Sequence, residues 1–334
     1  MRSLASIQMV REITEIPESD FLEVAHIMGW QCVVKKGEFQ KGQLGIYFEV
    51  DSFLPVEPRY EFLRASSCRA NEDNGEGFRI RTVKLRGQLS QGLILPRSSF
   101  PELDSFNEGS DVTENLNVKK WYIPETATSG GVVIGSRPHG MPTSDEIRIQ
   151  SALDLLDKLT GKPYYITTKM DGTSGTVYCI DGKVGCCSRN KEIKDEEGAL
   201  YWMPVYKYGL REKLLSLGKN IMLIGEICGP GVQKNKLRLP ELGWYVFDVV
   251  DMDTLEQYPY DKARELCENL GLTTVPLEER GDNFSYSLEV LLEKAKGKYP
   301  SGLFKEGIVV RDANRPKAVS FKALNNDALL KEKD

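Results

Sequence analysis

Residues 167–179 read TTKMDGTSGTVYC and place a lysine, an aspartate and a glycine on a short turn between two runs of β-branched and aromatic residues. A lysine can act as a nucleophile only when it is deprotonated, and its ordinary pKa is about 10.4. A site that uses Lys169 must therefore destabilise the ammonium form, which nearby cations do. Outside such a site, Lys169 is a solvated charge, and Asp171 with Gly172 is an ordinary Asp-Gly turn.

Two glutamates lie within apolar runs downstream of this turn. Glu226 stands in GEICG and Glu306 in EGIVVR, and both segments are predicted strands. Because an unpaired carboxylate is costly to bury, a cation must meet each of them. That cation is either a structural ion-pair partner or a divalent metal ion, which prefers oxygen ligands.

Aromatic and cationic side chains follow further along the chain. In YVFD, Tyr245 and Phe247 alternate onto one face of a predicted strand, where they form either a flat surface for a nucleobase or part of the core. Arg189 lies in SRN, Arg311 closes EGIVVR, and Lys322 lies in SFK. Each of these cations is either a surface charge or a contact for a ligand.

In this order, KMDG, SRN, GEICG, YVFD, EGIVVR and SFK resemble the motifs of the covalent nucleotidyltransferases. That superfamily comprises ATP- or NAD-dependent polynucleotide ligases and RNA-capping guanylyltransferases. The resemblance implies that Lys169 attacks the α-phosphorus of ATP, with Asp171 and Lys322 as further catalytic residues. The products would be a lysyl-AMP phosphoramidate and pyrophosphate, and Mg²⁺ or Mn²⁺ would be required.

The resemblance also implies which residues bind the cofactors. The metal ligands would be Glu226, Glu306 and Asp171, and the metal together with Lys322 would lower the pKa of Lys169. The nucleotide would contact Lys169, Gly172, Arg189, Glu226, Tyr245, Phe247, Glu306, Arg311, Lys322 and Arg148. Arg148 follows a helix-start signature and either faces the nucleotide or substrate or makes a helix-capping salt bridge.

The first hundred residues alternate short β-rich runs with turn signals, as in LGIYFEVDSFLP and FRIRTVKLRGQLSQGLILP. This pattern predicts a small antiparallel barrel or sandwich. The segment also resembles the OB-fold module that precedes the adenylyltransferase domain in one group of ATP-dependent RNA ligases. The expected fold is therefore α+β, with an OB-like barrel followed by an ATP-grasp-like nucleotidyltransferase domain of antiparallel sheets with flanking helices.

Composition along the chain indicates the domain boundaries. A stretch rich in Ser, Thr, Gly and Pro predicts a linker over residues 116–140. The OB-like, nucleic-acid-binding module is then expected over residues 1–115 and the catalytic domain over 141–334. Within the catalytic domain, the apolar periodicity of residues 148–161 predicts an amphipathic helix that ends at Gly161.

The net charge of −5 argues against a protein that coats nucleic acid nonspecifically, so any polynucleotide site must be local. In an extended strand, Arg79 and Arg81 would share one face and Lys84 and Arg86 the other, unless a bulge intervenes. A local basic surface is the alternative to a merely solvated strand. The residues expected to contact nucleic acid are Lys35, Lys36, Arg79, Arg81, Lys84 and Arg86.

Several classes of protein are excluded by composition. No apolar run reaches the roughly 18 residues that span a bilayer, and no secretory signal is recognisable. The seven cysteines fit neither a disulfide framework nor a zinc motif, and the two histidines argue against a histidine-based mechanism. We therefore expect an intracellular protein with no membrane association.

Together these features predict an ATP-dependent RNA ligase that seals 3′-hydroxyl and 5′-phosphate ends through lysyl-AMP and an adenylylated 5′ end. Its partner would be a nucleic acid, either RNA ends or a nicked duplex, and the enzyme would be a monomer. The alternatives are a DNA ligase, an enzyme like the RNA-capping guanylyltransferases, or a non-catalytic OB-fold nucleic-acid-binding protein.

Overall fold

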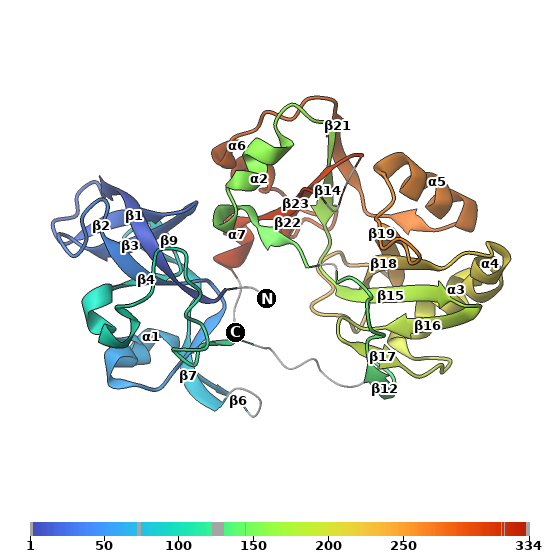
Figure 1. The fold of residues 1–334 in the computed structure, drawn as a ribbon, viewed down its shortest axis with the longest axis horizontal. Coiled ribbons are helices and arrows are strands. Elements are labelled where there is room, and N and C mark those ends of the chain that lie inside the picture. Colours follow the sequence, from blue (N-terminus) through green and yellow to red (C-terminus); the bar gives the residue numbers. More distant parts are fainter. Residues whose placement is uncertain are drawn as a thin grey trace. The chain divides into compact units, whose positions relative to one another are not determined.

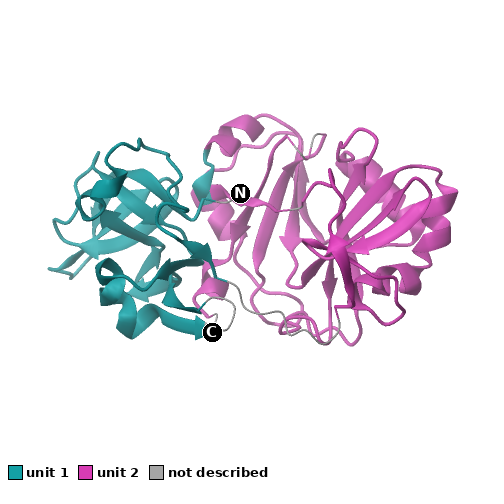
Figure 2. Cartoon of the chain, turned by 60° about the horizontal axis from the view of Figure 1, so that its bottom comes forward, with its two compact units in different colours: residues 1–126, 150–153, 332–334 teal, residues 127–149, 154–331 magenta. Residues whose placement is uncertain are grey.

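The structure is a computed structural model that describes residues 3–71, 75–121, 130–143, 145–314, 316 and 318–331. It divides the chain into two compact units (Figure 1, Figure 2). Unit 1 comprises residues 1–126, 150–153 and 332–334, and unit 2 comprises residues 127–149 and 154–331. The domain limits expected from the sequence, 1–115 and 141–334, remain proposals. The described residues of the expected linker, 116–140, contribute a strand to each unit.

Unit 1 is built on a five-stranded sheet in the order β10-β4-β1-β2-β3. The long strand β1 pairs with β4 through its first half and with β2 through its second half, and the register shifts between Val10 and Glu12. Such a bulge bends a strand, so one strand serves two sides of a barrel. The strands are β1 (Ala5–Glu15), β2 (Leu22–Ile27), β3 (Trp30–Lys35), β4 (Leu44–Phe48) and β10 (Leu93–Pro96).

A second sheet, in the order β11-β5-β7-β6, and the hairpin β8-β9 complete this barrel. Unit 1 has two apolar cores: one contains Trp30 and Tyr47, and the other contains Phe48, whose ring centre lies 5.8 Å from that of Tyr60 and 6.2 Å from that of Phe100. The predicted OB fold is confirmed. The elements are β5 (Ser52–Pro55), η1 (Pro58–Leu63), α1 (Arg64–Ser67), β6 (Cys68–Asn71), β7 (Gly75–Arg79), β8 (Thr82–Leu85), β9 (Gln88–Gln91), η2 (Arg97–Ser99), η3 (Pro101–Leu103) and β11 (Lys119–Lys120).

The expectation of one continuous strand through Arg79, Arg81, Lys84 and Arg86 is wrong. Strand β7 ends at Arg79, and β8 begins at Thr82 in a different sheet. The N–H of Ile80 donates to the carbonyl of Ser52, the first residue of β5, at 2.8 Å, and the Ile80 carbonyl accepts from the N–H of Asp51 in the turn before β5 at 2.8 Å. The alternation that assigned these four cations to two faces therefore does not hold.

The larger sheet of unit 2 has seven strands in the order β12-β17-β16-β15-β18-β19-β20. Helices α3, α4 and α5 pack on one of its faces through a shared apolar core (Figure 1). The elements are β12 (Val133–Ser136), β15 (Thr173–Ile180), β16 (Lys183–Cys187), β17 (Lys191–Ile193), η5 (Leu200–Trp202), α3 (Met203–Tyr208), α4 (Leu210–Ser216), β18 (Ile221–Cys228), β19 (Gly243–Asp251), α5 (Tyr260–Leu270) and β20 (Thr273–Thr274).

The smaller sheet of unit 2 has five strands in the order β13-β23-β22-β14-β21. One face, with Ile166, Ile308 and Phe321, packs with α2 and α6 into an apolar core. By alternation, Thr167, Lys169 and their neighbours lie on the other face. The elements are β13 (Ile147–Arg148), η4 (Ile149–Ser151), α2 (Asp154–Leu159), β14 (Tyr164–Lys169), β21 (Leu277–Gly281), α6 (Leu288–Lys294), β22 (Gly307–Asp312), β23 (Ser320–Leu324) and α7 (Asn326–Leu329).

The helix predicted over residues 148–161 is wrong over its first half. Ile147 and Arg148 form β13, which pairs in parallel with β23, and the helix α2 covers only Asp154–Leu159. Sheet pairing therefore overrides the helical periodicity, although Gly161, with φ +79°, still follows the helix as expected. In the described part of the chain, none of the helices combines the length and apolarity needed to span a membrane.

Candidate active site

Lys169 is the last residue of β14, and Glu306 directly precedes β22. The two strands pair with Lys169 opposite Gly307, which brings both side chains to the same end of the sheet. The Nζ atom of Lys169 lies 2.9 Å from Oε1 of Glu306, with side-chain exposures of 23% and 28%. A primary amine and a carboxylate thus meet in a half-buried pair that a ligand can still reach.

Glu226 joins this pair from the larger sheet. It lies on β18 opposite Ser174 of β15, and its side chain points away from the face that the helices cover. Between Lys169 and β15 the chain passes Gly172, where a Cβ would lie 2.2 Å from the carbonyl oxygen of Ile227. Glycine is therefore required by the close approach of β18, which brings Glu226 towards the lysine.

Three carboxylates surround Lys169 in this site and outweigh its single positive charge. Burial by itself lowers the pKa of Lys169, but Glu306, Glu226 and Asp171 outweigh it and raise that pKa above its usual range. Burial raises the pKa of Glu226 to about 7, although Lys169 partly opposes this rise. The chain's own residues thus favour the ammonium form, so the cations that would release the free amine must come with a ligand.

The carboxylates fit a divalent cation that keeps part of its hydration shell. Among the described residues, no group of three or more His, Cys, Asp and Glu could by itself hold a metal ion. Asp171, Glu226 and Glu306 nevertheless interact electrostatically around one lysine. Mg²⁺ commonly binds through one or two carboxylates, several waters and substrate phosphates, and this set of oxygens suits that mode.

A second lysine, which the sequence did not single out, lies beside Asp171. Nζ of Lys236 is 2.5 Å from Oδ2 of Asp171, and both side chains are largely buried. Lys236 belongs to the loop between β18 and β19, in which Gln233, Asn235 and Arg238 all have positive φ angles. Left-handed backbone at non-glycine residues is uncommon and often marks a functional loop.

Lys322 and Arg148 lie on the site face of the smaller sheet. Lys322 is paired with Val309 of β22 and with Arg148 of β13, and residues opposite each other share a face. Val309 is in turn opposite Thr167, two residues before Lys169. Both predicted cations therefore share the face that carries the lysine, and the helix-cap role for Arg148 is wrong because this residue lies in a strand.

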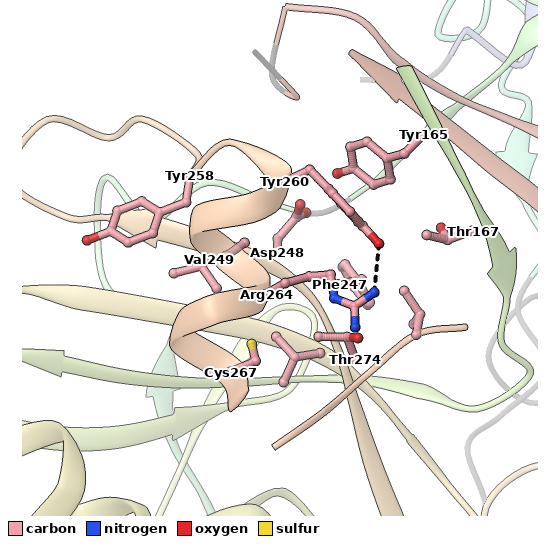
Figure 3. Close-up of a pocket in the computed structure, with 13 residues that line it drawn as sticks. Tyr165, Thr167, Phe247, Asp248, Val249, Tyr258, Tyr260, Arg264, Cys267 and Thr274 are labelled. Atoms are coloured by element: carbon pink, nitrogen blue, oxygen red, sulfur yellow. Dashed lines mark hydrogen bonds between the residues drawn. The ribbon is translucent and has the colours of Figure 1, made fainter. Parts of the chain in front are cut away.

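Thr167 is a further residue that the sequence analysis missed. Its side chain is buried, at 2% exposure, and its hydroxyl has no hydrogen-bond partner among the described residues. With Phe247 and Asp248 it lines a pocket between β14, β19 and α5 (Figure 3). The alternation of TTK could have placed it beside Lys169, because residues two apart in a strand share a face.

The two candidate aromatics differ in their surroundings. Phe247 lines this pocket together with Val275, whereas Tyr245 is opposite Glu226 and does not line it. Both rings contact a small apolar cluster around Met170. Of these two aromatics, Phe247 is therefore the one that lines the pocket, together with Tyr165, Tyr258 and Tyr260.

Arg311 and Arg189 do not gather at Lys169. Arg311 is 2% exposed and bonds to protein groups: its Nη2 lies 2.7 Å from Glu146 and 3.7 Å from Asp248, and its Nε bonds to Ser320 at 3.1 Å. Burial raises the pKa of Asp248 to about 6, although Arg311 lowers it in part. Arg189 lies in the exposed turn between β16 and β17 and pairs with Asp145.

The cations expected on unit 1 also fall into two groups. Lys35, Lys36, Lys84 and Arg86 are exposed, and Lys36 pairs loosely with Glu15 at 3.6 Å. In contrast, Arg79 is buried beside Asp51 at 3.5 Å, with its guanidinium 5.6 Å from the ring centre of Trp121. Arg81 is half-buried. The first group is available to a ligand, whereas Arg79 is part of the fold.

A lysine ringed by carboxylates where two mainly antiparallel sheets meet, preceded along the chain by an OB fold, defines a ligase of the covalent nucleotidyltransferase type. Two family models match the chain: an OB-fold domain over residues 4–97 and an RNA ligase domain over residues 162–324. The chain belongs to the RNA ligase family.

Solved structures of an RNA ligase from Naegleria gruberi resemble the whole chain. The structure of that ligase with pyrophosphate is 35% identical and has a TM-score of 0.94, with full coverage of both chains. A mutant with ATP and Mn and another with AMP and Mn give the same identity, coverage and score. No curated protein matches the chain. The expectations of an RNA ligase and of its two-part fold are confirmed.

Proposed function

We propose that this RNA ligase uses ATP and joins 3′-hydroxyl to 5′-phosphate ends through a lysyl-AMP intermediate. The observation that carries the proposal is the pair of Lys169 and Glu306 at 2.9 Å, with Glu226 and Asp171 around it. The Naegleria gruberi ligase, with ATP and Mn or with AMP and Mn in its structures, supports the same cofactors here.

Three nucleotidyl transfers account for the reaction. The amine of Lys169 loses a proton and attacks the α-phosphorus of ATP, so that an N–P bond forms and the bond to pyrophosphate breaks. A 5′-phosphate oxygen then attacks the same phosphorus, which breaks the N–P bond and transfers AMP to the RNA end. Finally, the 3′-hydroxyl attacks the 5′-phosphate, forms the phosphodiester bond and expels AMP.

Asp171, Glu226 and Glu306 would hold a divalent cation, Mg²⁺ or Mn²⁺. When bound, that cation supplies positive charge, which favours the free amine and stabilises the negative charge of the transferring phosphate. Until then Glu306 keeps Lys169 oriented at the end of β14. Lys322 and Arg148 lie two and three strands away on the same face and would bind phosphate oxygens.

The pocket lined by Thr167 and Phe247 would receive the adenine base (Figure 3). Phe247 offers a flat ring for stacking, and the buried hydroxyl of Thr167 offers a hydrogen bond that the described protein groups leave unused. Arg311 lies over the ring of Phe247 at 5.6 Å and is held by two carboxylates. We therefore propose that Arg311 holds the Phe247 ring in place and does not contact the nucleotide directly.

The exposed cations of unit 1, Lys35, Lys36, Lys84 and Arg86, would contact the RNA backbone, while Arg189 would approach ribose or phosphate. Phosphate contacts by a few exposed cations are compatible with an acidic total charge, because they act locally. A monomeric state and an intracellular location complete the proposal, and the seven cysteines, all unpaired, suit a reducing compartment.

Incubation with α-labelled ATP and Mg²⁺ or Mn²⁺ tests the proposal. We expect label that stays on the denatured protein, is absent from Lys169→Ala, and persists in Lys183→Ala, which removes an exposed lysine of β16 instead. Addition of a 5′-phosphorylated RNA should then discharge the label. A protein that forms no adduct with either metal, or that is labelled only by GTP, contradicts the proposal.

A further inference from the structure

Tyr299 lies behind the candidate active site, in the turn-rich segment between α6 and β22. It is 4% exposed, and its backbone closes a tight loop in which its N–H donates to the Leu303 carbonyl at 2.8 Å. The N–H of Gly302 donates to the Tyr299 carbonyl at 2.9 Å. The ring is thus fixed by a local turn that carries no residue of the active site.

The hydroxyl of Tyr299 bridges the main chains of the two paired residues. It donates to the carbonyl oxygen of Lys169 at 2.6 Å and accepts from the N–H of Glu306 at 3.1 Å. Glu306 lies just outside β22, whose first residue is opposite Lys169. The phenol therefore extends the link between the strands to the point where both side chains leave the backbone.

A second bridge holds the same two segments through their preceding residues. Glu278 of β21 accepts a hydrogen bond from Oγ1 of Thr168 at 2.8 Å. Its two carboxylate oxygens also accept from Nζ of Lys305 at 2.7 and 2.6 Å, and Lys305 is buried. Residues 168–169 and 305–306 are consequently joined twice, once by side chains and once by the Tyr299 hydroxyl.

We infer that Tyr299 is a positioning residue for the adenylylation of Lys169, an inference that rests on the proposed function. Its hydroxyl fixes the backbone positions from which Lys169 and Glu306 extend, and hence the placement of the nucleophile against the bound ATP. A displacement of about 1 Å in a reacting group can reduce a rate by about 100-fold. The contribution of Tyr299 is therefore to the chemical step, and nucleotide affinity is left unchanged.

The test is the single-turnover rate of adduct formation in Tyr299→Phe, which removes the bridging oxygen and keeps the ring. We expect a rate 10- to 100-fold below wild type at saturating ATP, with the ATP concentration for half-maximal rate changed less than threefold. Tyr164→Phe is the matched control. It removes another buried hydroxyl of the same unit, which bonds to Glu279 and Tyr286, and it should leave the adduct rate unchanged.

A structural role alone would appear differently. If Tyr299→Phe and Tyr164→Phe lower the melting temperature and the adduct rate to the same extent, or if Tyr299→Phe reacts at the wild-type rate, the inference is overturned while the proposed function stands. If wild-type protein forms no adduct, both fail. The adduct assay of the wild-type protein therefore distinguishes failure of this inference from failure of the proposed function.

A double-mutant cycle adds a readout that loss of folding does not produce. We infer that Tyr299 acts by holding Glu306 against Lys169, so in the Glu306→Gln background, where that ion pair is lost, the further change Tyr299→Phe should reduce the adduct rate by less than threefold. An additional 10-fold loss in that background would show that Tyr299 does not act through the Lys169–Glu306 pair and would overturn the inference.

Discussion

Replacing Arg311 with methionine tests whether this residue supports the fold or contacts the nucleotide. Its side chain is buried between Glu146 at 2.7 Å and Asp248 at 3.7 Å, and the side chains are 2%, 14% and 3% exposed, respectively. Removing one partner of a buried ion pair costs about 3–5 kcal/mol, because the other partner stays buried and charged. For a domain of this size, each kcal/mol of lost stability lowers the melting temperature by about 2–4 °C. The melting temperature of unit 2 should therefore fall by roughly 10 °C.

The loss should depend on pH because of Asp248. The pKa of this carboxyl is raised by burial to about 6, above its unfolded value of about 3.9. In the folded protein Asp248 therefore holds its proton up to a higher pH than in the unfolded chain, and stability falls as pH rises from about 4 to 6. Without Arg311 this pKa rises further, so the variant should lose less stability at pH 5, where Asp248 is neutral, than at pH 8.

Differential scanning calorimetry at pH 5 and pH 8, combined with the adduct assay, distinguishes the two roles. Arg311→Lys is the comparison, since it keeps a cation but cannot bridge two carboxylates in a planar fork. We expect Arg311→Met to lose more stability than Arg311→Lys, and both variants to lose more stability at pH 8 than at pH 5. A methionine variant as stable as wild type at both pH values, but unable to form the adduct, would refute the reasoning and make Arg311 a nucleotide ligand.

Two further predictions concern the site and unit 1. In Gly172→Ala the new Cβ would meet the Ile227 carbonyl at 2.2 Å, so the turn between Lys169 and β15 must move away from β18 by about 1 Å, and adduct formation should fall about 100-fold. Gly135→Ala, with open space around it, is the control. Unchanged labelling of Gly172→Ala would contradict this account. The double change Lys35→Ala and Lys36→Ala should weaken RNA binding and reduce its salt dependence by roughly one phosphate contact per lysine. Arg79→Ala, in contrast, should mainly lower stability. Unaltered RNA affinity of the double variant would show that RNA binds elsewhere.

Much of the architecture follows from local sequence patterns. The apolar runs around Lys169, Glu226 and Glu306 become β14, β18 and β22, and the polar residue types that interrupt them are those that meet at the site. The resemblance to nucleotidyltransferases supplied the order of these motifs. Strand alternation in TTK separates the core face, with Ile166 and Thr168, from the site face, with Thr167 and Lys169, and could have identified Thr167 as well.

Other features depend on pairings that no local pattern contains. The segment after residue 147 has helical periodicity, but Arg148 forms a strand because β23, far along the chain, offers an open edge for it. The strand expected through Arg81 breaks because the chain up to Ile80 pairs with β5, whereas β8 pairs with β9 in a separate hairpin. Lys236 and Tyr299 come from loops, and only the folded chain brings them to Asp171 and Lys169.

The pairing of β14 with β22 and of β13 with β23 has a consequence for synthesis of the enzyme. Lys169 emerges from a ribosome well before Glu306 and Lys322, on the order of ten seconds earlier at about 5–20 residues per second. During that interval Lys169, the proposed nucleophile, has neither Glu306 beside it nor β23, the strand that carries Lys322. On the proposed roles of these residues, we expect adduct formation only after translation has passed β23, so a nascent chain stalled before that point should not consume ATP or modify RNA ends.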